Sequence, residues 1–269
     1  DPAMERLATL LAMSEADSER RFGGLRRLYG DDGYARVRRA SVAVVGLGGV
    51  GSWAVEALAR SGVARLVLID FDHVAESNVN RQIQATGRTL GMAKGQALRE
   101  RIADIHPACE VKVVDEFATA ENWPGLLPCP VQAVIDACDQ GPAKLAMAQR
   151  ALAEPVGFVC AGAAGGKQLA QRVELADLAE VTHDPLLATL RQRLRKAGAP
   201  RQGRIGVTCV FSRESVSAPE AAECASDGSL NCHGYGSCVA VTATFGMVAA
   251  GEVLRGLATQ DWKCPKTRC

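Results

Sequence analysis

Short apolar runs alternate with longer amphipathic segments through the first 165 residues of the chain. Five runs are nearly continuous in apolar side chains and predict buried strands. They lie at residues 41–45, 65–69, 111–114, 131–135 and 156–160. The segments between them predict helices, at residues 50–60, 92–105 and 142–153. Because such strands are typical of parallel sheets with helices on both faces, the pattern predicts an α/β fold, Rossmann-like, with a doubly wound and mostly parallel sheet.

The second half of the chain breaks this rhythm. We expect residues 167–175 and 205–211, with a basic helix near residues 185–196, to form an elaboration that covers the ligand site. Residues 213–236 are rich in Ser, Ala, Gly and acidic side chains and predict a mobile loop. The sequence thus divides into four parts. They are an arm at residues 1–40, a Rossmann-like domain at residues 41–165, a C-terminal elaboration at residues 166–257 and a tail at residues 258–269.

Residues 234–254 are largely apolar and about as long as a membrane-spanning helix. However, this segment is rich in Gly, Ala, Ser and Thr, and Glu252 interrupts it. Small residues allow a helix to pack closely against its neighbours. We therefore expect a buried helix packed on the sheet, and no stable membrane span.

A glycine-rich turn follows the first predicted strand and opens the first predicted helix. Gly46, Gly48, Gly49 and Gly51 form a G-x-G-x-x-G pattern, whose backbone N–H groups and helix dipole face a phosphate. Asp70 follows at the end of the next strand, where a carboxylate can bind ribose hydroxyls. Taken alone, this pattern points first to NAD or FAD.

Charged residues beyond the second strand change that interpretation. An NAD site does not need an Arg and a Lys beside its glycine turn, as Arg81 and Lys94 would be here. A triphosphate does, because they neutralise its oxygens and the charge that develops when pyrophosphate leaves. Asp139 follows the fourth strand, where a Mg²⁺ ligand would reach the same phosphates. The sequence therefore predicts ATP and Mg²⁺, with Arg81, Lys94 and Asp139 as catalytic residues.

This set of residues resembles the ubiquitin-activating-enzyme-like superfamily, which includes the bacterial adenylating enzymes of thiamine and molybdopterin synthesis. The shared features are the glycine turn, an Asp-x-Asp after the second strand, an Asn-x-Asn-Arg-Gln motif, a downstream Lys and an Asp-x-x-Asp at residues 136–139. The resemblance implies adenylation of a carboxylate by ATP and Mg²⁺, commonly in a homodimer. The nucleotide-binding candidates are Gly46, Gly48, Gly49, Gly51, Asp70, Asp72, Asn78, Asn80, Arg81, Gln82 and Lys94.

Further motifs resemble the tRNA threonylcarbamoyladenosine dehydratases, and this resemblance covers nearly the whole chain. They lie at residues 21–30, 162–166, 184–186, 206–212 and 242–246. The resemblance implies that ATP adenylates the threonyl carboxylate of threonylcarbamoyladenosine in tRNA. Intramolecular attack on the activated carbonyl then forms a ring and releases AMP. Because the attacking group is already tethered to the substrate, no protein nucleophile is required.

Two departures separate this chain from the thiamine and molybdopterin enzymes. Those enzymes carry an Arg in the leading arm that reaches the partner's ATP, whereas Gly24 stands here, near Arg21 and Arg27. They also carry paired Cys-x-x-Cys motifs for zinc, and the ten Cys of this chain form none, so we expect no zinc. Both departures favour the dehydratase over an adenylating enzyme that activates the C-terminal Gly of a ubiquitin-like sulfur carrier. An NAD-dependent oxidoreductase and a non-catalytic tRNA-binding partner remain alternatives.

The charge distribution agrees with a nucleic-acid substrate. The formal net charge is +1, yet residues 185–213 contain no acidic side chain. A neutral protein with one concentrated basic face suits a polyanion. No aromatic residues are interleaved with the charges, so we expect contacts mainly to the tRNA backbone. The tRNA-contact candidates are Arg191, Arg193, Arg195, Lys196, Arg201 and Arg204.

Cys232 lies in a Gly-rich stretch and is a candidate sulfur acceptor, because the resembling family is associated with a cysteine desulfurase. An unreactive loop thiol is the simpler interpretation, since a reactive Cys needs exposure and a lowered pKa. No signal peptide is recognisable in residues 1–40. We therefore expect reduced cysteines and a cytoplasmic protein.

Overall fold

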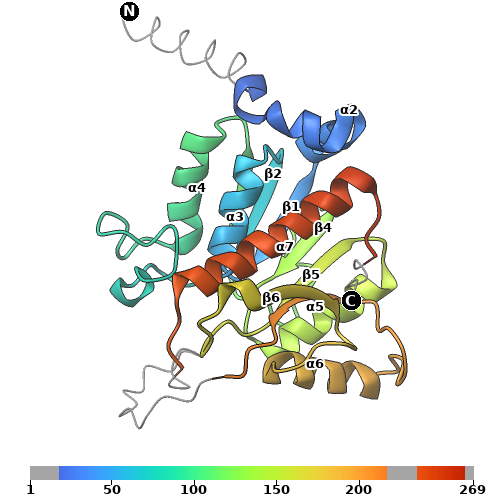
Figure 1. Cartoon of the computed structure of the whole chain (residues 1–269). Helices are drawn as coiled ribbons and strands as arrows, with labels where there is room; N and C mark the ends of the chain where they lie inside the picture. Colours follow the sequence, from blue (N-terminus) through green and yellow to red (C-terminus); the bar gives the residue numbers. More distant parts are fainter. Residues whose placement is uncertain (1–17, 217–234, 264–269) are drawn as a thin grey trace, which may run out of the picture.

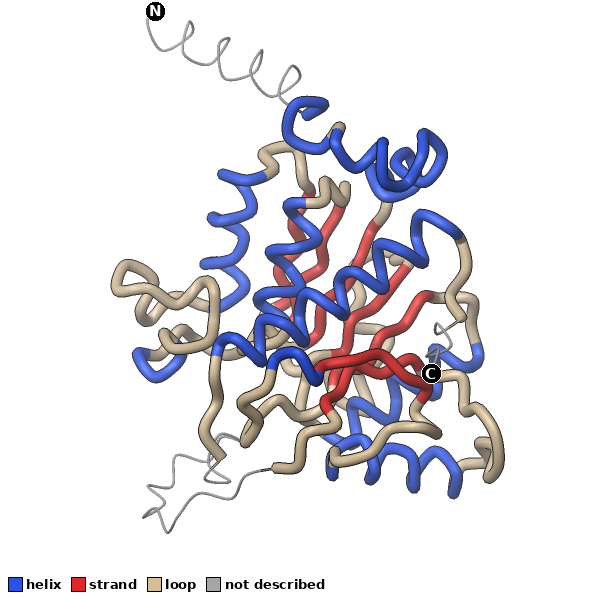
Figure 2. The backbone as a smooth tube through the Cα atoms, in the orientation of Figure 1, coloured by secondary structure: helices blue, strands red, loops and turns tan. Residues whose placement is uncertain are grey.

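A seven-stranded sheet forms the centre of the protein (Figure 1, Figure 2) in a computed structural model that describes residues 18–216 and 235–263. The strand order is β3-β2-β1-β4-β5-β7-β6. All neighbouring strands are parallel except β6, which runs antiparallel to β7. The strands are β1 Ser41–Val45, β2 Arg65–Ile69, β3 Glu110–Val114, β4 Ala133–Asp136, β5 Gly157–Ala161, β6 Val173–Asp177 and β7 Thr208–Ser212.

Helices cover both faces of the sheet. They are α2 Gly24–Arg39, α3 Gly51–Arg60, α4 Lys94–Ile105, α5 Gly141–Ala153, α6 Pro185–Lys196 and α7 Val239–Thr259, with 3-10 turns η1 Glu76–Asn78 and η2 Ala170–Arg172. Alternate residues of β1 point to opposite faces. Val42 and Val44 join a core with α3, α4 and α7, whereas Ala43 and Val45 join a core with α5. This confirms the predicted doubly wound α/β fold.

Helix α7 crosses the sheet on the same face as α3 (Figure 1). Its residues Phe245, Ala249 and Val253 are fully buried in the core. By length and composition alone, α7 is the one described helix that is apolar enough to cross a membrane, and 56% of its apolar window is buried. The structure therefore places the apolar segment in the core of the fold, as its small residues predicted.

The elaboration after residue 165 continues the same sheet. Strand β7 pairs with β5, and β6 closes the edge. Strand β4 ends one residue later than expected, so Asp136 belongs to the strand. Residues 217–234, which include Cys232 and most of the predicted mobile loop, lie outside the described residues, as do 264–269.

The strand order reverses direction at β1. This strand pairs with β2 on one side and with β4 on the other. The loops that follow β1 and β4 therefore lead to opposite faces, and ligands bind in the crevice between such loops. The glycine turn follows β1 and the loop with Asp139 follows β4, so both flank this switch point.

Candidate functional site

The glycine turn, residues 46–51, lies directly against the loop that follows β4. Gly46 has a positive φ of 86°, and a Cβ on it would lie 2.7 Å from the Ala137 carbonyl oxygen. A Cβ on Gly51 would lie 1.7 Å from the Gly46 carbonyl oxygen. Only glycine fits either position. The turn therefore presents bare backbone at the start of α3, as a phosphate cradle requires.

Asp70 holds the glycine turn from the end of β2. Its side chain is buried, and its two oxygens accept hydrogen bonds from the backbone N–H groups of Leu47 (2.6 Å) and Asp72 (2.8 Å). Burial raises the pKa of Asp70 above its ordinary value, even though Lys94 and these N–H groups act in the opposite direction. Each oxygen keeps a second lone pair, which a ribose hydroxyl can use.

Lys94 begins α4 and turns its side chain back toward β2. Its Nζ lies 2.9 Å from Asp72 Oδ2, and its backbone N–H donates to the Asp72 carbonyl (3.0 Å). The Lys94 side chain is 7% exposed, whereas that of Asp72 is 54% exposed. The ion pair thus positions a buried ammonium next to Asp70, with its carboxylate partner on the solvent side.

Arg81 is a buried cation beside the glycine turn. Its Cγ lies 3.2 Å from the position that a Cβ on Gly49 would occupy. Its Nη1 donates to the Ser77 carbonyl (2.8 Å) and to Asn80 Oδ1 (2.9 Å), and no carboxylate among the described residues pairs with it. Burial lowers the pKa of the guanidinium, since nothing negative compensates for lost solvent. Such a site favours an anionic ligand.

The amides of the Asn-x-Asn-Arg-Gln motif have separate tasks. Asn78 Oδ1 accepts from the backbone N–H of Ala75 (2.9 Å) and so stabilises the start of η1. Asn80 Nδ2 donates to the Ser237 carbonyl (3.1 Å), just before α7. Gln82 Nε2 lies 3.9 Å from the position of a Cβ on Gly48. The structure therefore brings Asn80, Arg81 and Gln82 to the glycine turn or its surroundings.

Gln84 is a buried contact of the glycine turn that was not predicted from the sequence. Its Nε2 donates to the Leu47 carbonyl (2.9 Å) and to Gln82 Oε1 (3.2 Å). Its own Oε1 is buried and has no partner within the described structure. A second Gln two residues after the motif carried no recognisable signal, because its role depends on the path of the loop.

Asp139 is exposed on the loop after β4, and its Oδ1 accepts from Gln140 Nε2 (3.1 Å). The loop is anchored by Asp136, whose Oδ1 accepts from the backbone N–H of Cys138 (3.1 Å). Because Ala137 touches Gly46, Asp139 extends from the same crevice as the glycine turn. Its role at the phosphates stays a prediction.

A buried ion pair beneath this loop was not predicted. Lys144 Nζ lies 2.8 Å from Asp136 Oδ2 and also donates to the Ala161 carbonyl (3.0 Å), with both charged side chains fully buried. Burial alone would lower the pKa of Lys144, but the adjacent carboxylate outweighs it, and the pKa is raised. The sequence signal that could have indicated this pair is a lysine within the apolar start of a predicted helix.

The basic helix α6 begins at the edge of the sheet that carries the glycine turn. Its N-cap Asp184 accepts from the backbone N–H groups of Leu187 (2.9 Å) and Ala163 (2.8 Å), the latter just beyond β5. Farther along the helix, Arg193 Nη1 lies 3.0 Å from where a Cβ on Gly141 would be. Gly141 begins α5, close after Asp139. The predicted tRNA-contact segment therefore adjoins the crevice.

The six tRNA-contact candidates divide into two groups. Arg191 Nη1 donates to the carbonyls of Leu178 (3.1 Å) and Val181 (2.7 Å). Arg204 lies 3.6 Å from the buried carboxylate of Asp177. The side chains of Arg191 and Arg204 are therefore already bonded to other parts of the fold. The others, Arg193, Arg195, Lys196 and Arg201, form no ion pair with any residue in the described part of the chain.

Two further features surround the site. Phe71 and Phe117 follow β2 and β3, are each about half exposed, and have ring centroids 5.5 Å apart. This exposed aromatic pair was not predicted.

In the arm, Arg21 donates to the carbonyls of Asp104 (3.1 Å) and Ile105 (2.8 Å) at the end of α4, and Arg27 is exposed. A role of either Arg across a dimer stays a prediction.

Comparison with known proteins identifies the family of this chain. The ThiF family matches residues 22–268. A tRNA threonylcarbamoyladenosine dehydratase from Haemophilus influenzae is 38% identical over 91% of this chain and 96% of its own length. The Escherichia coli protein of the same name is 40% identical over 87% of this chain and 92% of its own length.

The fold is similar as well. A crystal structure of the Escherichia coli tRNA N6-threonylcarbamoyladenosine dehydratase in complex with ATP has a TM-score of 0.81 and 39% identity, covering 90% of this chain and 95% of that one. Its complex with AMP matches with the same TM-score. The chain therefore belongs to the ThiF family and, within it, to the tRNA threonylcarbamoyladenosine dehydratases.

Proposed function

We propose that this chain is an ATP-dependent enzyme that cyclises threonylcarbamoyladenosine in tRNA. The threonyl carboxylate attacks the α-phosphate of ATP, which forms an acyl-adenylate and releases pyrophosphate. A nucleophilic group of the same modified nucleoside then attacks the activated carbonyl and displaces AMP. The nucleoside loses one water overall. Relatives of the same name, and one of them in complex with ATP and with AMP, support this reaction.

The residues of the crevice provide a distinct contact for each part of the nucleotide. The glycine turn presents backbone to the phosphates, and Asp70 accepts from the ribose hydroxyls. Arg81 and Lys94 balance the charge of the triphosphate and of departing pyrophosphate. Phe71 follows Asp70 directly, and Phe117 follows the neighbouring strand β3, so the adenine ring can pack against their exposed rings. No side chain is needed as a nucleophile.

Asp139 fits a role as a Mg²⁺ ligand. Mg²⁺ at phosphates is usually held by one or two carboxylates and by phosphate oxygens, so a dense ligand cluster is not required. The described residues contain no group of three or more Asp, Glu, His or Cys side chains that could hold a metal ion, whereas Asp139 is a single exposed carboxylate at the crevice. When bound there, the ion would neutralise charge on the phosphates.

The observation that carries the proposal is the position of Arg81, a buried guanidinium with no carboxylate partner beside the phosphate-binding turn. Such an unpaired cation supports a site for a polyanionic nucleotide. The direct test is mass spectrometry of nucleosides from tRNA that carries threonylcarbamoyladenosine, after incubation with the protein, ATP and Mg²⁺. We expect ATP-dependent loss of one water. An unchanged nucleoside, with ATP still exchanging pyrophosphate in the presence of a sulfur-carrier protein, would refute the proposed substrate.

A homodimer, a cysteine desulfurase partner and a cytoplasmic location stay predictions. Helix α2 supports the first of these, because its Leu28 side chain is 71% exposed and Arg27 is exposed beside it. Light scattering coupled to size-exclusion chromatography would measure the oligomeric state. A dimer that Leu28→Asp converts to a monomer would place the interface on α2.

A further inference from the structure

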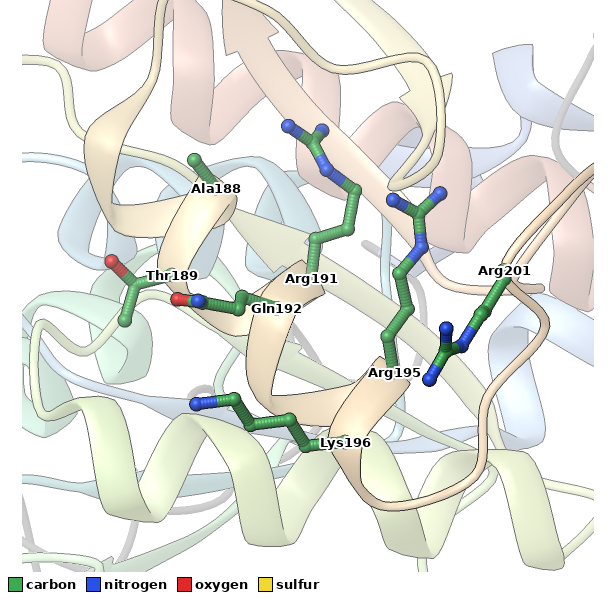
Figure 3. Close-up of a pocket in the computed structure, with 7 residues that line it drawn as sticks. All are labelled: Ala188, Thr189, Arg191, Gln192, Arg195, Lys196 and Arg201. Carbon is green, nitrogen blue, oxygen red and sulfur yellow. The ribbon is translucent and has the colours of Figure 1, made fainter.

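A pocket of about 550 Å³ lies between the exposed side of α6 and the loop that follows it (Figure 3). Arginine and lysine side chains extend from the helix, and Arg201 comes from the loop (Figure 3). We call it the basic pocket. Its lining residues are Ala188, Thr189, Arg191, Gln192, Arg195, Lys196 and Arg201.

The basic pocket has no negative charge of its own. No acidic side chain lines it, and none occurs in residues 185–213. Within the described part of the chain, the side chains of Arg195, Lys196 and Arg201 form no hydrogen bond or ion pair. Cations in the last turn of a helix also stabilise its dipole, but Arg201 lies beyond that turn. Because these cations are unpaired and lie in a concave site, the pocket favours the binding of an external anion.

Two arginines of the pocket are preorganised for such an anion. Arg191 is held by the carbonyls of Leu178 and Val181. Arg195 has its Nε buried without a hydrogen-bond acceptor. This buried Nε is out of reach of a ligand, so an anion in the pocket would be met by the terminal guanidinium N–H groups. Arginine also presents several N–H groups in a fixed fork that matches a phosphate.

The position of the pocket relates it to the crevice. Helix α6 begins beside Ala163 at the end of β5, and its Arg193 reaches Gly141 near Asp139. Arg193 is thus a basic residue between the pocket and the ATP site. A polyanionic strand that crosses α6 would have one phosphate in the pocket and a nucleotide farther along the strand directed toward the crevice.

We propose that the basic pocket binds a backbone phosphodiester of the tRNA substrate, several nucleotides from the one that is modified. This inference rests on the proposed function, because it identifies where that substrate is held. Arg195, Lys196 and Arg201 supply the charge, and Arg191 fixes the shape. Thr189 and Gln192 are uncharged polar neighbours of the phosphate.

The test compares tRNA binding by the full chain and its variants, by fluorescence anisotropy over a range of salt concentrations. The triple variant Arg195→Ala, Lys196→Ala, Arg201→Ala should bind tRNA about 10-fold or more weakly, with a shallower dependence on salt. A second variant, Gln192→Glu, places a negative charge in the pocket and keeps every cation, so it should also weaken binding. A charge-matched control, Arg20→Ala, Arg39→Ala, Arg99→Ala, removes three exposed arginines outside the pocket.

The ATP affinity of each variant, measured by calorimetry, shows whether the nucleotide site is intact. If the triple variant and the control bind tRNA equally well, or if Gln192→Glu has no effect, the pocket is not the phosphate site. That result would leave the proposed function unaffected, provided that the wild-type protein converts the nucleoside. If the wild-type protein neither binds tRNA nor converts the nucleoside, both proposals are wrong.

Discussion

Replacing Lys144 by Met tests whether the buried ion pair holds the loop that follows β4. Met has a similar length but no charge, so Asp136 would stay fully buried without its partner at 2.8 Å. Removing one member of a buried pair costs about 3–5 kcal/mol, because the remaining charge is uncompensated. The bond from Lys144 to the Ala161 carbonyl is lost as well. We expect a decrease of that size in the free energy of unfolding.

Urea unfolding monitored by circular dichroism measures this loss. The matched control is Lys112→Met, which breaks the exposed Lys112–Glu110 pair, also 2.8 Å long, and should cost about 0–1 kcal/mol. The double variant Lys144→Met, Asp136→Asn removes both charges, so it should be more stable than Lys144→Met alone. If Lys144→Met is no less stable than the Lys112 control, or the double variant is less stable than Lys144→Met, the ion pair does not have this role.

Three further substitutions examine the crevice and the core. Arg81→Ala should abolish adenylation, measured by pyrophosphate exchange. The thermal midpoint of the protein should not fall, because Arg81 has no ion pair to lose. A variant that unfolds would contradict the placement of Arg81 in the crevice. Gly46→Ala should weaken ATP binding, measured by calorimetry, and destabilise the fold by about 1–3 kcal/mol, because φ is positive at Gly46. A variant that binds ATP with wild-type affinity would exclude a tight turn at this position. Burial, with Arg38 nearby, lowers the pKa of His106 from 6.5 to about 4. Below pH 6.5, His106 therefore takes up a proton in the unfolded chain but stays neutral in the folded protein. The free energy of unfolding should therefore fall between pH 6.5 and 4 more steeply than in His106→Gln, and equal slopes would refute a buried neutral imidazole.

Residues at the ends of consecutive strands could be predicted from the sequence. The glycine turn and Asp70 end β1 and β2, and parallel strands bring their ends together at one edge of the sheet. Arg81 and Lys94 follow within the next connection, so the same reasoning extends to them. This part of the site could be predicted because it depends only on the pattern of strands and helices and on the parallel direction of the strands.

Contacts between distant elements could not be predicted in this way. Lys144 reaches Asp136 and Ala161 because α5 turns back across β4 and β5, a path that residue spacing does not specify. Asn78 belongs to a motif, yet its amide oxygen is used within its own turn. Strands β6 and β7 extend the main sheet although their order in it, β5-β7-β6, differs from the chain order. Each outcome depends on tertiary packing, which a single sequence shows only indirectly.

The place of α7 has a consequence for how the chain folds as it is synthesised. Thr242 of this helix lies 3.3 Å from the position of a Cβ on Gly49, so the floor of the glycine turn comes from the opposite half of the chain. Strands β1 to β5 leave the ribosome long before the helix that covers one of their faces. Until α7 arrives, that apolar face is open to other nascent chains, and chaperones bind such surfaces. Nucleotide binding should therefore appear late in translation, after the helix has docked.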